Sequence, residues 1–347
     1  MAEQITLKDI AKALGVSLGT VERAIHGKED INPETKRRVL EKIRELNYQP
    51  NKYARSLSLK KKKRIAIIMP FTSRFWHRVK AGLDDAVKEL SYYGLQVKFI
   101  GLDRMNRHLL ASHIRAQRDE NYDALILAPT GLEDEGEFLK QVISENTRLV
   151  LLNDDMPELS RHFYVGPNNE LVGKLAGELV GKFTQGQGKC LILSCHNAKT
   201  GQMQLECQRR ITGFQQVLNE EYPLMRTQVE SYGMYLEDAY GTVLHALQQN
   251  REITCVYDAE GLLDETAMAV KDSGRKGIPL VGHEMSEEVD RYLKEGVVSA
   301  AICQNPYLQG YYAFKCLAEY LVEGKKPEEE NVYIDFNIYT KYNTFRK

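Results

Sequence analysis

The chain has 347 residues, of which 43% are hydrophobic and 27% charged, so it can form two or three domains and bury a substantial core. No stretch is apolar for long enough to span a bilayer, and the first 20 residues lack the apolar run of a signal peptide, so we expect a soluble, cytoplasmic protein. The six cysteines form no CxxC pair and no Cys/His spacing typical of zinc, which predicts buried thiols in a reducing compartment and no metal site.

The net charge of −1 conceals an uneven distribution of charge along the chain. Residues 1–64 carry 16 Lys and Arg against 8 Asp and Glu, a net charge of +8, whereas the remainder carries 31 against 40, a net charge of −9. A small basic region joined to a large acidic one indicates that a polyanion binds the basic region alone.

Three short helices are predicted at the start of the chain. Thr6 can cap the first helix, which ends at Gly15, a residue that easily adopts a left-handed conformation. Ser17 can cap the second helix, and Asn32 followed by Pro33 can begin the third. The apolar residues that recur at helical spacing, and that we expect to face inward, are Leu7, Ile10, Ala11, Leu14, Val21, Ala24, Ile25, Val39, Leu40, Ile43 and Leu46. This pattern is typical of a helix-turn-helix.

The start of the second predicted helix exposes Leu18, Gly19, Glu22 and Arg23. A helix-turn-helix inserts its second helix into the DNA major groove, which is wide enough for one helix. We therefore predict a DNA-binding domain over residues 1–49.

A basic segment, PNKYARSLSLKKKK, follows the third helix. Leu57 lies there among polar and basic neighbours without a core of its own. An apolar side chain in such a position can enter a base step from the minor groove and kink the duplex. We predict a hinge helix and linker over residues 50–63.

The motifs LKDIAKALGVS, GTVERAIHG and PNKYARSL resemble segments of the LacI/GalR family of bacterial transcription regulators. The resemblance implies that the second helix reads bases, that several hydroxyl groups contact phosphates, and that the hinge helix inserts a leucine at the operator centre. The matching positions are Leu18, Gly19 and Arg23 for bases, Thr6, Ser17, Thr20 and Thr35 for phosphates, and Asn51, Ala54 and Leu57 for the hinge.

Two positions of the second helix depart from the family pattern. Gly19 has no side chain, so it cannot read a base edge by hydrogen bonding. Glu22 places a carboxylate where many members carry a small polar residue. It can accept a hydrogen bond from a cytosine amino group, or it can pair with Arg23 or Lys28 and read nothing.

Strands and helices alternate from residue 64 onward. Near-continuous apolar strands such as RIAIIMP, DALILAP and ITCVYDA are separated by amphipathic helices, which favours parallel sheets with helices on both faces. The alternation occurs in two similar halves, and ligands bind at the carboxyl ends of the strands in such sheets. We therefore predict an α/β core with a cleft between two lobes.

The family resemblance implies that this core, residues 64–347, has the two-lobed periplasmic-binding-protein type I fold with three crossovers, preceded by the small all-α domain. The expected crossings lie near residues 161–167, 292–298 and 324–332. The N-lobe is then expected to comprise about 64–163 and 296–323, and the C-lobe about 164–293 and 329–345. The same core is expected to mediate dimerisation.

Polar and aromatic residues near the expected strand ends, together with Arg210 in a predicted helix, are the candidate effector contacts. They are Ser73, Phe75, Trp76, Asp154, Asp155, Arg210, Asp258, Glu260, Glu284 and Gln304. By resemblance, the Phe75-Trp76 pair matches stacking residues of sugar-binding relatives, and Arg210 matches a cleft arginine that can fork two hydrogen bonds to adjacent hydroxyls. The residues leave open which of Asn153, Asp154 and Asp155 contacts the ligand.

Carboxylates that accept hydrogen bonds, an arginine that donates two and an aromatic surface for stacking together favour a neutral monosaccharide or polyol as the ligand. A phosphorylated ligand fits less well because the carboxylates would repel it, and a nucleobase stays an alternative because it would also stack. The eight histidines are scattered and are expected to be surface or satisfied core residues.

These features predict a sequence-specific DNA-binding regulator, a repressor by expectation, controlled allosterically by a small sugar or polyol. It is expected to bind near-palindromic operator DNA as a homodimer or tetramer, without a cofactor or a membrane. The motifs GxxxxGK[ST] and HExxH are absent, so we expect no enzymatic activity. The alternative is a solute-binding protein of a sugar transporter, against which the basic N-terminal region argues.

Overall fold

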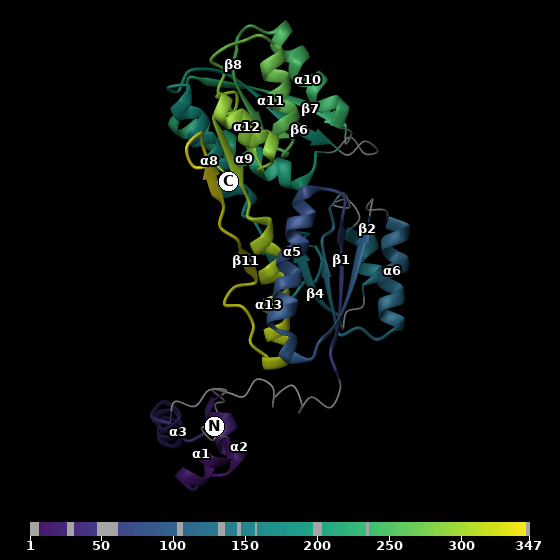
Figure 1. Cartoon of the computed structure of the whole chain (residues 1–347), viewed down its shortest axis with the longest axis vertical. Helices are drawn as coiled ribbons and strands as arrows, with labels where there is room; N and C mark the ends of the chain where they lie inside the picture. Colours follow the sequence, from purple (N-terminus) through teal and green to yellow (C-terminus); the bar gives the residue numbers. More distant parts are fainter. Residues whose placement is uncertain are drawn as a thin grey trace. The chain divides into compact units, whose positions relative to one another are not determined.

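The computed structural model describes residues 7–25, 31–46, 62–102, 107–130, 136–143, 147–156, 158–196, 203–233 and 236–344. The chain divides near residue 62 into two compact units, which we call the head and the core (Figure 1). No helix within the described segments is both long enough and apolar enough to cross a lipid bilayer.

The head contains α1 (Leu7–Leu14), α2 (Leu18–Ile25) and α3 (Pro33–Glu45). Gly15, with a φ of 66°, ends α1, and the Ser17 hydroxyl caps α2 by accepting a hydrogen bond from the Thr20 N–H at 3.1 Å. Asn32 caps α3 through its side-chain oxygen, which accepts from two backbone N–H groups. The buried cluster consists of Ile10, Ala11, Val21, Ala24 and Val39. Of the residues expected to face inward, Leu40 is half-buried and lies outside this cluster.

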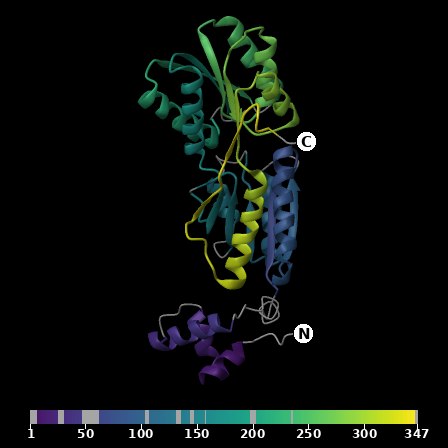
Figure 2. The ribbon, with the colours of Figure 1, turned by 60° about the vertical axis from the view of Figure 1, so that its left-hand side comes forward.

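The first lobe of the core is built on a six-stranded parallel sheet in the order β11-β5-β4-β3-β1-β2. Its strands are β1 (Arg64–Pro70), β2 (Gln96–Leu102), β3 (Ala124–Leu127), β4 (Arg148–Leu152), β5 (Phe163–Gly166) and β11 (Asn331–Tyr333). Its helices are α5 (Arg74–Glu89), α6 (Arg107–Asp119), α7 (Gly136–Val142) and α13 (Pro306–Glu323), with the short η1 (Ser91–Tyr93). Helices α5 and α13, far apart in sequence, lie side by side (Figure 2).

The second lobe is built on a six-stranded sheet in the order β12-β10-β9-β8-β6-β7, in which only β12 is antiparallel to its neighbour. Its strands are β6 (Gly188–His196), β7 (Met225–Gly233), β8 (Ile253–Asp258), β9 (Leu280–His283), β10 (Ala300–Cys303) and β12 (Asn337–Tyr339). Its helices are α8 (Asn169–Phe183), α9 (Leu205–Glu221), α10 (Leu236–Gln249), α11 (Leu263–Asp272) and α12 (Glu287–Glu295).

Successive residues of β6 face opposite sides of this second sheet. Leu191 and Leu193 pack against α10 and α11, whereas Cys190 and Ile192 pack against α8 and α9. Both faces of the strand are therefore buried, which explains its continuous apolar sequence.

Two of the three crossings between the lobes lie elsewhere than the sequence predicts. Residues 300–303 pair with β9, so the second crossing follows them at Gln304-Asn305 rather than near 292–298. Residues 331–333 pair with β5, so the third crossing lies at residues 334–336 rather than near 324–332. The prediction erred because strands of only four and three residues carry no signal of which sheet they join. Asn305 ties these two crossings together, since its Nδ2 donates to the carbonyl of Asp335.

Candidate functional site

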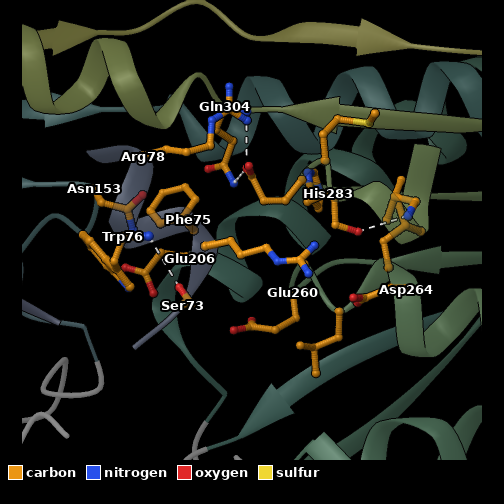
Figure 3. A pocket seen from close by; sticks show the side chains of 18 of the residues that line it. Ser73, Phe75, Trp76, Arg78, Asn153, Glu206, Glu260, Asp264, His283 and Gln304 are labelled. Carbon is orange, nitrogen blue, oxygen red and sulfur yellow. Dashed lines mark hydrogen bonds between the residues drawn. The ribbon is translucent and has the colours of Figure 1, made fainter. Parts of the chain in front are cut away.

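A pocket of about 670 Å³ lies in the core, lined by residues that follow the carboxyl ends of strands in both sheets (Figure 3). Figure 3 shows Phe75, Trp76 and Asn153 on one side and His283 and Asp264 on the other. The size and the mixture of aromatic and polar lining are typical of a site for a small molecule.

The aromatic wall of the pocket is fixed by the start of α5. The Ser73 hydroxyl caps this helix and accepts from the Trp76 N–H at 3.5 Å, which places residues 75 and 76 in the first turn at the pocket. The Phe75 and Trp76 rings meet edge to face, with centroids 5.1 Å apart at 86°. Such an arrangement gives a stiff apolar surface against which one face of a ring can pack.

A polar corner beside this wall follows β4. The Asn153 backbone has a φ of 68°, and its carbonyl accepts a hydrogen bond of 2.7 Å from the Tyr164 hydroxyl. Asn153 Nδ2 donates to Asp154 Oδ1 at 2.5 Å, and the Thr130 hydroxyl donates to Asp154 Oδ2. Asn153 and Asp154 therefore reach the pocket as one hydrogen-bonded unit.

Arg210 is held at the centre of the second lobe by the close packing of α8 against α9. A Cβ on Gly173 would lie 1.9 Å from the Arg210 carbonyl oxygen, so only glycine allows this approach. The guanidinium is 5% exposed and donates to Asn169 Oδ1 and the Ala259 carbonyl, both at 2.8 Å, and to Gln304 Oε1 and the Glu260 carbonyl, both at 3.2 Å.

These four contacts correct the expectation that Arg210 can fork two hydrogen bonds to a ligand. A guanidinium has five N–H donors, and the protein engages four of them, so one is left for a ligand unless a contact rearranges. The arginine lines the pocket, but it mainly orders the residues around it.

Gln304 and Glu284 continue this network along the edge of the second sheet. Gln304 Nε2 donates to Glu284 Oε1 at 2.8 Å, and the Gln304 backbone N–H donates to the same oxygen at 3.3 Å. Burial raises the pKa of the Glu284 carboxyl, although these hydrogen bonds and the nearby guanidinium of Arg210 act in the opposite direction.

His283 lines the pocket, which the sequence did not predict for any histidine. It is fully buried, and its Nε2 lies 2.9 Å from the Tyr257 hydroxyl, while the Tyr257 ring stacks on Phe214 at 4.5 Å. Burial lowers the pKa of the imidazole well below its usual value, and Arg210 lowers it further, so the ring is neutral. Its Nδ1 has no hydrogen-bond partner among the described residues.

Acidic residues gather where β8 ends and α11 begins. Glu260, Asp264 and Glu265 line the pocket there. Burial, together with the neighbouring Asp264 carboxyl, raises the pKa of Glu265 to about 8. Glu260 Oε2 accepts a hydrogen bond of 2.9 Å from the Cys207 thiol. This end of the pocket is therefore rich in hydrogen-bond acceptors.

The structure brings eight of the ten predicted effector residues to the pocket: Ser73, Phe75, Trp76, Asp154, Arg210, Glu260, Glu284 and Gln304. Asp155 lies outside the lining because Arg161 binds it through Nε at 2.6 Å and Nη2 at 3.0 Å. Asp258 lies outside because it accepts from the backbone N–H groups of Glu260 and Gly261. Burial raises its pKa to about 6.

Further lining residues were missed by sequence reasoning: Arg74, Arg78, Thr130, Gln204, Glu206, Asp264, Glu265, His283, Met285, Ser286 and Glu288. Several of them occupy the first turn of a helix that follows a strand, as Arg74, Asp264 and Glu288 do. The first turn of a helix that follows a strand therefore predicts lining residues, because it lies at the same edge of the sheet as the end of that strand.

In the head, Leu18, Gly19, Glu22 and Arg23 share the exposed surface of α2. The hydroxyls of Ser17 and Thr20 lie 2.9 Å apart at its start, and the Thr35 N–H donates to the capping Asn32. The other predicted DNA contacts, Thr6, Asn51, Ala54 and Leu57, lie outside the described residues.

Comparison with known families matches both units of the chain. Residues 65–326 match the periplasmic binding protein domain, which covers most of the chain. Residues 6–51 match the bacterial regulatory proteins of the lacI family.

Curated relatives include two bacterial regulators. The HTH-type transcriptional regulator RegA of Clostridium saccharobutylicum is 31% identical over 131 residues, which cover 38% of this chain and 38% of RegA. Catabolite control protein A of Staphylococcus epidermidis is 34% identical over 92 residues, which cover 26% of this chain and 28% of that protein. The aligned regions thus span between about a quarter and two fifths of these relatives.

Solved structures resemble the chain over most of its length. GanP, a glucose-galactose binding protein from Geobacillus stearothermophilus, has a TM-score of 0.72 at 21% identity and covers 82% of this chain and 99% of that one. An ABC transporter solute binding protein from Agrobacterium vitis, bound with α-D-tagatopyranose, has a TM-score of 0.70 at 21% identity and covers 81% of this chain and 96% of that one. These two likenesses show the fold of the core. The chain therefore belongs to the proteins with a periplasmic binding protein domain, and its N-terminal region carries the helix-turn-helix match to the bacterial regulatory proteins of the lacI family.

Proposed function

We propose that this protein is a transcriptional repressor whose affinity for operator DNA is controlled by a small sugar or polyol bound in the core pocket. The observation that carries the proposal is the presence, in one chain, of an exposed recognition helix and an aromatic and polar pocket between two lobes. A solute-binding protein would need the pocket and not the head.

The pocket lining supports the ligand class. Phe75 and Trp76 offer an apolar surface for one face of a sugar ring, and Asn153, Asp154 and Gln304 offer hydrogen-bonding groups around it. The excess of carboxylates disfavours a phosphorylated ligand, because bringing like charges together in a partly buried site is costly. The names of the two solved structures above refer to sugars, which is consistent with this class.

The mechanism needs two arrangements of the lobes. A ligand that contacts both lobes favours the arrangement in which both sets of contacts form, and it changes operator affinity only to the extent that it binds the DNA-competent arrangement differently. Two copies of the chain would present two recognition helices to the two halves of a near-palindromic operator. This function, which requires no enzymatic step, places the protein in the bacterial cytoplasm.

Deletion of residues 1–60 tests the division of labour between head and core. We expect the truncated protein to lose operator binding in a fluorescence-anisotropy titration and to keep the rise in melting temperature that a ligand causes in the full chain. Arg23→Ala in the full chain is the matched point variant, with reduced operator affinity and an unchanged response to ligand. Specific operator binding by the truncated protein would contradict the proposal.

A further inference from the structure

Three guanidinium groups of the described residues line the core pocket, and the protein engages them to very different extents. Arg74 pairs with the Glu288 carboxylate at 2.8 Å. Arg210 gives four of its donors to protein acceptors. Arg78 forms no hydrogen bond and no ion pair within the described part of the chain. It therefore keeps all of its N–H donors available to a ligand.

The position of Arg78 on α5 brings its side chain to the pocket. Residues three and four apart share one face of a helix, so Arg78 lies one turn beyond Phe75 and Arg74. Its side chain is half-buried and enters the pocket on the same side as Phe75 (Figure 3). One turn further, Gly82 packs so closely against α13 that a Cβ would lie 1.9 Å from the Tyr307 carbonyl oxygen. The helix that carries Arg78 is thus held firmly in place.

Glu284, which follows β9 in the second lobe, lies within electrostatic reach of this guanidinium. Burial raises the pKa of the Glu284 carboxyl, whereas Arg78 is among the groups that lower it. Glu284 Oε1 accepts from the side chain and the backbone of Gln304, but Oε2 has only the Cys303 thiol, a weak donor, at 3.7 Å. The Glu284 backbone has a φ of 70°, and such strained conformations concentrate at binding sites.

We infer that Arg78 determines effector specificity by donating two parallel hydrogen bonds to a pair of adjacent hydroxyl groups, to which Glu284 also binds. This inference rests on the proposed function and assigns to the first lobe a contact that the sequence did not predict. A planar guanidinium presents two parallel N–H groups, which match two neighbouring oxygens. A hydroxyl group both accepts and donates, so one pair can accept from Arg78 and donate to Glu284.

A neutral diol fits these two residues better than a carboxylate does. A carboxylate on the ligand would also match the two N–H groups of Arg78, yet it could not donate to Glu284 and would lie close to a second negative charge. Adjacent hydroxyl groups occur on the edge of a sugar ring whose face packs against Phe75 and Trp76. Because Arg78 and Glu284 belong to different lobes, the diol would join the lobes and favour their closed arrangement.

The test removes the guanidinium and the hydroxyl groups separately. Full-length protein is screened by thermal shift with D-glucose, D-galactose, D-mannose, D-ribose, D-xylose, L-arabinose and their alditols. The tightest binder and its monodeoxy analogues are then titrated in a calorimeter. We expect Arg78→Met to weaken the parent compound roughly tenfold or more, and to weaken two analogues that are deoxy at neighbouring carbons only about threefold.

The outcomes of this comparison separate the inference from the proposed function. Equal losses for the parent compound and for every deoxy analogue would overturn the inference and leave the proposed function intact. Tighter binding of the corresponding uronic acid than of the parent sugar would overturn the diol as the group that Arg78 binds. No binding by any compound would contradict both the inference and the proposed function.

A second variant distinguishes the paired hydrogen bonds from the charge. Arg78→Lys keeps a positive charge near Glu284 but lacks two parallel N–H groups, so we expect it to weaken the parent compound roughly fivefold. Arg115→Met removes an exposed arginine of α6 outside the pocket lining and, as the matched control, should leave the affinity unchanged. Unchanged affinity in Arg78→Lys would contradict recognition by paired hydrogen bonds.

The stability of the ligand-free protein provides a further readout. Because Arg78 has no partner among the described residues, Arg78→Met should shift the melting temperature of the ligand-free protein by less than about 2 °C. The same variant should lose most of the rise in melting temperature that the parent compound causes in the wild type. A large fall in the melting temperature without ligand would contradict the inference, since it would show that Arg78 supports the fold.

Discussion

The two lobes of the core share one architecture and present different chemistry to the pocket between them. The first lobe contributes Phe75, Trp76, two guanidinium groups and one carboxylate, whereas the second contributes six carboxylates and one guanidinium. The shared fold thus determines where a ligand binds, and the side chains of each lobe determine which groups of the ligand are recognised. An aromatic wall facing an acidic wall indicates a ligand with one apolar face and one donor-rich edge.

The difference between the lobes also bears on their closure. Arg74 at the start of α5 reaches across to Glu288 at the start of α12, so the basic side of one lobe contacts the acidic side of the other. The guanidinium of Arg78 in the first lobe likewise acts on the carboxyl of Glu284 in the second.

The largest effect is expected from Arg210→Ala, which removes the centre of the second lobe. Its four acceptors, among them Asn169 and Gln304, would stay buried without a donor. Breaking a buried charged network costs about 3–5 kcal/mol, so urea or thermal unfolding should show a loss of this order. Arg209→Ala, one residue earlier and outside the pocket lining, is the control, with a change within about 0.5 kcal/mol. Similar losses in the two variants would contradict a special role for Arg210.

Phe75→Ala should lower ligand affinity more than it lowers the stability of the fold, because this half-buried ring belongs to the aromatic wall of the pocket. We expect effector affinity to fall roughly tenfold, which is the loss of about 1.4 kcal/mol of ring contact. Calorimetric titration measures it. Phe71→Ala is matched in chemistry and lies in the same lobe, 39% exposed and outside the lining, and should leave the affinity unchanged. An unchanged affinity in Phe75→Ala would remove the aromatic wall from the binding site.

Glu265→Gln should change how stability depends on pH. The folded protein raises the pKa of this carboxyl from 4.5 to about 8, so it binds the proton more tightly than the unfolded chain does. The stability from this group is present below pH 4.5 and is lost as the pH rises toward 8.

Between pH 6.5 and 8 the melting temperature of the ligand-free protein should therefore fall less in Glu265→Gln than in the wild type. The expected difference is roughly 2 °C, because the group is half-buried and solvent screens part of the effect. Asp258, with a pKa of about 6, is largely ionised throughout this window and serves as an internal control. Parallel curves for the two proteins would show that Glu265 does not titrate in this range.

The smallest effect is expected from the ion pair that joins the lobes. Arg74 and Glu288 have side chains that are 65% and 40% exposed, and ion pairs of this kind contribute little. Arg74→Glu should weaken effector binding about two- to threefold at low salt, and the double variant with Glu288→Arg should restore it. The difference in effector affinity between Arg74→Glu and the wild type should vanish at 1 M salt, where charges are screened within about 3 Å. A salt-independent loss would indicate a direct ligand contact instead.

Much of the fold follows from the periodicity of the sequence. The near-continuous apolar segments became buried parallel strands, as β1 and β8 show, and the glycine at position 15 ends α1 with the expected positive φ. The strands at 300–303 and 331–333 were harder to place because they are only four and three residues long. Their sheet is decided by pairing partners distant in sequence.

The pocket was predictable at strand ends and less so elsewhere. Asp154 and Asp155 are adjacent and chemically identical, and only the position of Arg161 turns the second away from the pocket. Glu265 lies in a helix and His283 is the last residue of an apolar strand, so neither sequence position signals a ligand contact. Long-range packing, which local sequence patterns do not encode, decided these cases.

The most direct test of ligand-controlled DNA binding uses full-length protein and a DNA fragment that the protein itself selects from random sequence. Fluorescence anisotropy at 0.15 M salt gives the affinity for this fragment without ligand and with a saturating sugar or polyol identified by calorimetry. We expect ligand to change the affinity at least tenfold, with the change lost in Phe75→Ala, and DNA to change ligand affinity by the same factor. The same DNA affinity with and without bound ligand would contradict control of the head by the core.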